Sequence, residues 1–93
     1  MKLWLISQTE NIGYDTYDSA VVAAETEDQA RGMNPGGDDY KWYDGKWWVK
    51  YPSGRVSLDR SYDWVHPKNV SVKLIGNAET DIKGVICASY NAG

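Results

Sequence analysis

Cysteine, histidine and phenylalanine are scarce or absent in this chain of 93 residues. It has one cysteine, one histidine and no phenylalanine. The single Cys87 excludes an internal disulfide and favours a reducing compartment, so we expect a cytoplasmic protein. With one histidine, His66, and neither Cys-x-x-Cys nor His-x-x-x-His spacing, no metal site and no cofactor are expected.

Long hydrophobic runs are also missing. The apolar stretch after Met1 is too short for a signal peptide, and no run reaches the length of a membrane span. Hydrophobic residues make up 42% of the chain and charged residues 25%, which is ordinary for a folded protein. The length suits one domain over residues 1–93.

Charge is distributed unevenly, although the net charge is only −3. Residues 1–40 hold two basic and eight acidic side chains, a balance of −6, whereas residues 41–73 hold seven basic and three acidic, a balance of +4. Such asymmetry produces a bipolar surface unless the two segments interleave in the fold. The overall acidity argues against binding to long nucleic acids.

The hydrophobic pattern predicts an α+β fold. We expect a mostly antiparallel sheet of about four main strands at residues 2–8, 19–25, 69–76 and 84–90, with residues 9–18 as a polar loop. Both faces of the first strand are apolar, which is typical of a strand covered on both sides. In the third strand Val70, Val72 and Leu74 should point inward. Thr26 followed by Gln29 is a capping box and predicts a short helix.

Aromatic residues gather in the middle of the chain. Eight of the twelve lie between Tyr40 and Trp64. Asp44-Gly45 separates two β-prone runs and predicts a hairpin inserted into the sheet, and residues 56–58 read as a short edge strand. Trp47 and Trp48 are adjacent, so in a strand they must face opposite sides.

The hairpin is the first candidate binding site. Indole faces stack on bases and cationic side chains attract phosphates, so we expect ligand contacts from Trp42, Trp48, Lys46, Lys50 and Arg55. The competing interpretation is that these aromatic residues pair across the strands and cap a thin core.

Two polar segments form the second candidate. They are the loop at residues 14–18 and the tail at residues 89–93, whose side chains offer hydrogen-bonding groups of the kind that line small-ligand pockets or symmetric subunit contacts. The predicted site residues are Tyr14, Asp15, Tyr17, Tyr90 and Asn91. The alternative is an ordinary polar loop and a frayed terminus.

No arrangement of residues predicts catalysis. Cys87 lies in a predicted strand, where a small apolar core residue is the usual interpretation. The acidic pairs near Asp15 and Asp38 lie in Asn/Asp/Gly-rich loops, where carboxylates usually form turns. We therefore expect a binding protein and not an enzyme.

Both ends of the chain carry a family resemblance. About two-thirds of the chain resembles a family of small proteins encoded by tailed phages and prophages. The matching segments are Met1 to Leu5, Tyr14 to Glu27, Trp64 to Pro67, Val70 to Ala78 and Gly84 to Gly93. The aromatic middle lies outside the match. The resemblance implies a phage accessory protein, a class that commonly counters host defences.

These observations favour one function and leave another open. The leading hypothesis is a non-enzymatic, homo-oligomeric binder in the infected cell that sequesters a small nucleotide-type immune signal. The alternative is a protein–protein inhibitor whose acidic first half docks on a host defence protein, such as a CRISPR or other nuclease complex.

Overall fold

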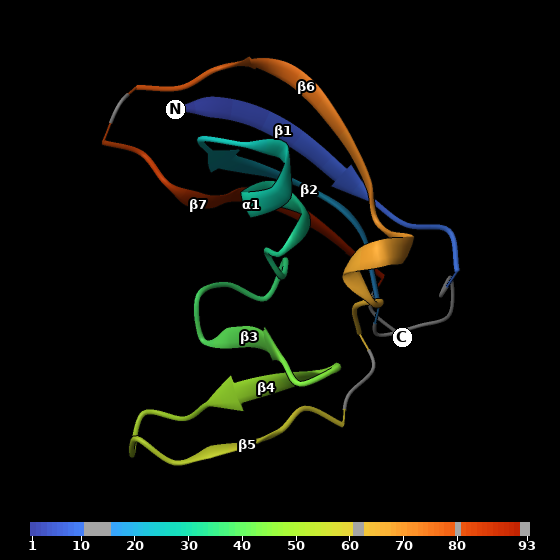
Figure 1. Ribbon diagram of the computed structural model, residues 1–93, viewed down its shortest axis with the longest axis vertical. Coiled ribbons are helices and arrows are strands. Elements are labelled where there is room, and N and C mark those ends of the chain that lie inside the picture. Colours follow the sequence, from blue (N-terminus) through green and yellow to red (C-terminus); the bar gives the residue numbers. More distant parts are fainter. Residues whose placement is uncertain (11–15, 61–62, 80, 92–93) are drawn as a thin grey trace.

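The computed structural model describes residues 1–10, 16–60, 63–79 and 81–91. In this part of the chain seven strands form two antiparallel sheets, with one short α-helix (Figure 1). The larger sheet has the order β6-β1-β2-β7, from β1 (Lys2–Ser7), β2 (Thr16–Ala24), β6 (Ser71–Asn77) and β7 (Gly84–Asn91). The smaller sheet has the order β3-β4-β5, from β3 (Tyr40–Tyr43), β4 (Lys46–Lys50) and β5 (Val56–Leu58). The predicted four main strands are present, but strands dominate the fold, and β5 completes a second sheet.

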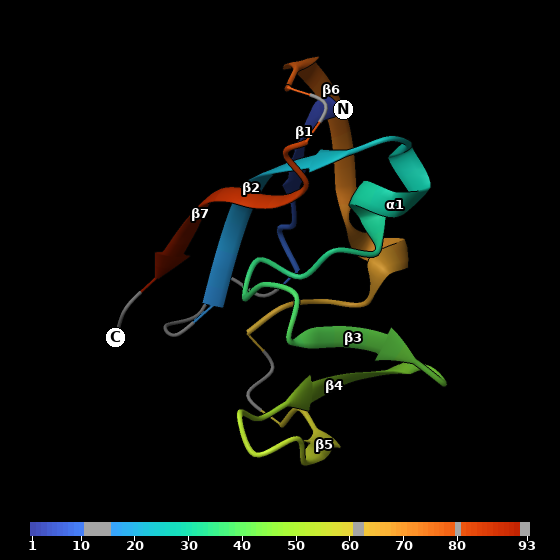
Figure 2. The same cartoon turned by 90° about the vertical axis from the view of Figure 1, so that its left-hand side faces the viewer.

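The core lies between the larger sheet on one side and α1 (Glu27–Arg31) with the smaller sheet on the other (Figure 2). From β1, Trp4 and Ile6 face this core, and from β2 the paired Val22 and Ala20 do the same. The Trp4 indole N–H donates to the Ala24 carbonyl at 3.1 Å. Burial of these apolar side chains is the main force that holds the sheet to the layer below it.

The first strand corrects one expectation. β1 is central, between β6 and β2, as its sequence indicates. Its second apolar set, Leu3 and Leu5, is only half-buried, so the described part of the chain does not cover this face completely. The prediction of cover on both faces was therefore wrong for the single chain.

β2 begins at Thr16, so residues 16–18 are strand and not loop as predicted. Thr16 is buried, and Tyr17 donates its backbone N–H to the Asp63 carbonyl at 3.0 Å. The register against β7 shifts between Tyr17 and Ser19. These tertiary bonds order a segment whose polar sequence reads as a loop.

The inward pattern predicted for the third strand fails at one position. Val70 is buried and Val72 packs against the core, but Leu74 is 52% exposed. The register between β1 and β6 shifts beside Leu74, which leaves Ile75 as an extra residue. Leu74 still pairs with the core residue Trp4, so its exposure reflects its place on the edge strand β6 and not a change of face. Cys87 is exposed, so its interpretation as a core residue is also wrong.

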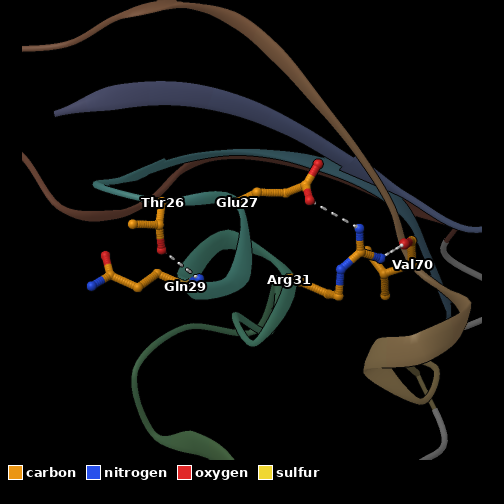
Figure 3. A network of polar contacts seen from close by, with 5 residues as sticks. All are labelled: Thr26, Glu27, Gln29, Arg31 and Val70. Atoms are coloured by element: carbon orange, nitrogen blue, oxygen red, sulfur yellow. Dashed lines mark hydrogen bonds and ion pairs between the residues drawn. The ribbon is translucent and has the colours of Figure 1, made fainter.

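The helix starts as predicted. Thr26 is the N-cap, and its side-chain oxygen accepts a hydrogen bond from the Gln29 backbone N–H at 3.2 Å (Figure 3). The Gln29 side chain bonds the backbone N–H of Glu25, one residue before the cap, at 3.0 Å. Arg31 lies 3.8 Å from Glu27 and also donates to the Val70 carbonyl, which ties α1 to the chain before β6. No helix in the described residues is long and apolar enough to cross a membrane.

Candidate functional site

The predicted hairpin is present. Asp44 and Gly45 both have positive φ, 52° and 74°, which is the signature of a type I′ turn. Trp42 lies directly opposite Trp47, and Lys41 lies opposite Trp48. Because paired side chains share a face, Trp42 and Trp47 point to one side and Trp48 to the other.

The inner face of the hairpin closes over an aromatic pocket. Trp47 is 7% exposed, and its indole N–H donates to the Val65 carbonyl at 2.9 Å, which fixes β4 to the segment before β6. The Trp42 ring meets Trp47 edge-on at 5.3 Å between centroids and the His66 ring at 4.3 Å. The pocket has a volume of about 280 Å³ and is lined by Trp42, Gly45, Lys46, Trp47, Leu58, Asp59, Trp64 and His66.

Four pocket residues come from outside the hairpin, and none was among the predicted site residues: Leu58, Asp59, Trp64 and His66. Trp64 is 4% exposed, and its buried indole N–H has no acceptor in the described part of the chain. His66 is exposed, and its Nδ1 accepts the Lys68 backbone N–H at 3.1 Å. In a neutral ring this leaves the proton on Nε2 as a donor. Trp64 and His66 join the site through tertiary contacts, namely the bond from Trp47 to Val65 and the ring contact between Trp42 and His66, which have no local sequence signal.

The outer face of the smaller sheet carries the other predicted residues. Trp48 is half-buried there, and its indole N–H donates to the Tyr43 carbonyl at 2.9 Å. Lys50 lies at the end of β4 away from the turn. The Arg55 guanidinium lies over the Tyr51 ring at 5.3 Å. Of the five residues predicted for the first site, the pocket therefore brings together only Trp42 and Lys46.

The second predicted site is described in part. Tyr14 and Asp15 lie outside the described residues. The rings of Tyr17 and Tyr90 meet edge-on at 4.7 Å, and Thr16 pairs with Asn91 at the end of the ladder between β2 and β7. These contacts make a packed strand end, and no described pocket includes these residues.

Two tyrosines beside the core have altered acidity. Partial burial raises the pKa of the Tyr17 phenol above 10.0, and the Asp63 carboxylate raises it further. Burial likewise raises the pKa of Tyr40, with additional contributions led by Asp63 and Asp59. Both phenols are therefore neutral donors near pH 7.

Two other hollows lie among the described residues. One, of about 280 Å³, lies between α1 and β7, and its lining mixes acidic and basic side chains, including Asp28, Asp38, Lys41 and Lys83. Asn34 also lines it, with an amide nitrogen that is buried and has no acceptor among the described residues. The other, of about 380 Å³, is lined by both Tyr40 and Tyr51. Neither concentrates aromatic faces as the hairpin pocket does.

Comparison with known proteins adds no assignment. No family model, no curated protein and no solved structure matches the chain. Among the described residues, no group of three or more histidine, cysteine or acidic side chains is placed to hold a metal ion. The resemblance to phage accessory proteins stays a prediction.

Proposed function

We propose that this protein binds a small ligand with a planar base, of nucleotide type, in the pocket under the hairpin, and that it holds the ligand without chemical change. The observation that carries the proposal is the lining of this pocket, in which three indoles and an imidazole surround a single hollow. Indole faces stack on bases with a free energy of about 1–3 kcal/mol per base.

Polar groups at the same pocket suit the rest of a nucleotide. Lys46 lies beside the turn at the edge of the pocket, where its long side chain can reach a phosphate at the rim, and His66 adds an Nε2 donor. Asp59 supplies carboxylate oxygens that can accept from the N–H groups of a base. The volume of about 280 Å³ lies at the lower end of small-ligand sites, which suits a base and part of its sugar with the phosphates at the rim.

Both aromatic walls are held in place before a ligand arrives. Trp47 is fixed by its hydrogen bond to Val65, and Trp42 packs between Trp47 and His66. A site built in advance loses less conformational entropy on binding. In the role that the family resemblance implies, a phage-encoded protein in the host cytoplasm would use this site to sequester a nucleotide immune signal.

The test is a titration of tryptophan fluorescence with mononucleotides, cyclic mononucleotides, cyclic dinucleotides and molecules of the cyclic ADP-ribose type. Trp42→Ala should raise the Kd roughly 5- to 150-fold, the equivalent of one lost stacking contact. Lys46→Ala should weaken binding most at low salt. The matched controls, Trp48→Ala and Lys50→Ala, change the same residue types away from the pocket and should leave the Kd within about twofold.

Two results would contradict the proposal. One is that no ligand in the panel changes the emission at any salt concentration. The other is that the pocket variants and the outer-face variants lose binding equally. If a host protein co-purified through the acidic first half instead, the protein–protein inhibitor would replace the nucleotide binder.

A further inference from the structure

The larger sheet has a second face, opposite α1, that no described element covers (Figure 2). Strand pairing places its side chains in rows that cross β6, β1, β2 and β7 in turn. We call this surface the open face. Its central row is Lys73, Leu5, Val21 and Cys87, and the row beside it is Ser71, Ser7, Ser19 and Ser89.

The central strands are apolar on this face as well as on the core face. Leu3 and Leu5 alternate with the core residues of β1, and Val21 alternates with those of β2. An antiparallel sheet with one face in water normally alternates apolar and polar side chains. The sequence of β1 is instead typical of a strand covered on both sides, and the described residues supply a cover on one side only.

The serine row favours a second copy of the same sheet as the partner that covers the open face. Four serines cross the whole sheet in register at Ser71, Ser7, Ser19 and Ser89. Small side chains let a second flat surface approach closely, as in sheets that pack about 10 Å apart. Because a hydroxyl both donates and accepts, a serine row is complementary to a copy of itself.

The distribution of charge on the open face also favours contact with a second copy of the chain. The two rows contain no acidic side chain, and Lys73 on the edge strand is their one charge. The whole chain carries −3, so two copies repel each other through most of their surfaces. Contact through the open face brings no carboxylates of these rows together.

The exposed area supports the same conclusion. The chain exposes 6042 Å², whereas a folded chain of 10.5 kDa exposes about 5,400 Å² by the usual scaling with mass. The excess of about 600 Å² belongs to the whole surface, of which the open face is one part, and a standard interface buries about 800 Å² on each partner.

We propose that a second copy of this chain covers the open face, so that the protein is a homodimer of two larger sheets packed face to face. The contact is isologous, with the central apolar row and the serine row of each copy meeting those of the other. The pocket under the hairpin shares no residue with these rows. The dimer and the nucleotide site can therefore fail independently.

Sedimentation of the full chain over a range of concentrations tests the dimer. The wild type should show a species of twice 10.5 kDa that dissociates on dilution. Val21→Lys places a charge from each copy in the contact and should raise the dissociation constant at least about a hundredfold. The matched control is Val56→Lys on β5, where the valine is 58% exposed, and it should leave the constant within about twofold.

Cys87 gives a second readout on the unmutated protein. It is exposed in the single chain and lies in the central row beside Val21. Its rate of alkylation should fall at least about tenfold, following the fraction of dimer, as the protein is concentrated through the dissociation range. A wild type that stays monomeric at every concentration overturns the proposal. So does a dimer that Val21→Lys leaves intact, or one in which Cys87 reacts as fast as in the monomer.

Discussion

Trp47 and Trp48 follow each other in β4 and point to opposite faces of the smaller sheet. Trp47 is 7% exposed and bonded to the Val65 carbonyl, whereas Trp48 is half-exposed and bonded to the nearby Tyr43 carbonyl. The Trp47 indole therefore joins the two layers of the molecule, whereas the Trp48 indole lies on the outer surface of the smaller sheet. The alternation of faces along a strand predicts this division from the sequence.

Replacing the two indoles separately should show the difference. Trp47→Ala should lower the free energy of unfolding by about 3–5 kcal/mol, since it empties a packed core position. Trp48→Ala should lower it by about 1 kcal/mol or less, since it removes one surface hydrogen bond and little burial. Urea denaturation measures both, and equal losses would contradict the assignment of faces.

Gly45 should be required by the hairpin turn. Its φ of 74° lies in the left-handed region, so Gly45→Ala should cost about 1–2 kcal/mol of unfolding free energy. Gly32 is the matched control, because it ends α1 at φ −83° and a Cβ there would meet nothing closer than 3.7 Å. Gly32→Ala should raise stability by about 0.4–1 kcal/mol. Thermal unfolding measures both variants, and an equal change in stability for Gly45→Ala and Gly32→Ala would contradict the assignment of the turn.

Thr26→Ala removes the N-cap of α1. Its side-chain oxygen accepts the Gln29 backbone N–H at 3.2 Å, so the loss should be about 1 kcal/mol. Glu27→Ala, one residue later, breaks only the exposed pair with Arg31 and should cost less than about 0.5 kcal/mol. Chemical denaturation that gives the opposite order would place the start of the helix elsewhere.

The neutral phenol of Tyr40 should stabilise the fold up to alkaline pH. Burial first, then Asp63, raises its pKa in the folded state above 10.0. The stabilisation is therefore complete below about pH 10 and is lost as pH rises through the folded-state pKa. Tyr40→Phe should flatten the alkaline fall in thermal stability, whereas Tyr43→Phe, at a position 73% exposed, should leave it unchanged. A wild type whose melting temperature is constant above pH 10 would contradict this linkage.

Local signals in the sequence predicted most of the elements. The capping box at Thr26 and the Asp-Gly turn each appear where expected, because each depends on a few adjacent residues. Strand bounds were less accurate where tertiary bonds decide them. Thr16 joins β2 although its neighbours read as a loop, and Leu74 is exposed on the edge strand β6 although it pairs with the core residue Trp4.

The site was less predictable than the fold. The indoles of the hairpin stand out in the composition, but the pocket needs Trp64 and His66, which tertiary contacts of Trp47 and Trp42 bring beside them. Lys50 and Arg55 looked equivalent to Lys46 in sequence. They lie away from the turn, because strand direction and pairing separate the two ends of β4.

The measurement that tests the nucleotide site most directly is an NMR titration of the indole N–H signals of the five tryptophans. The added ligand is the nucleotide that binds tightest in the fluorescence panel. The Trp42 and Trp64 signals should shift with saturation, since both side chains line the pocket, while Trp48 on the outer face should stay unchanged. Shifts confined to Trp48, or no shift in any indole signal at saturating ligand, would contradict the site.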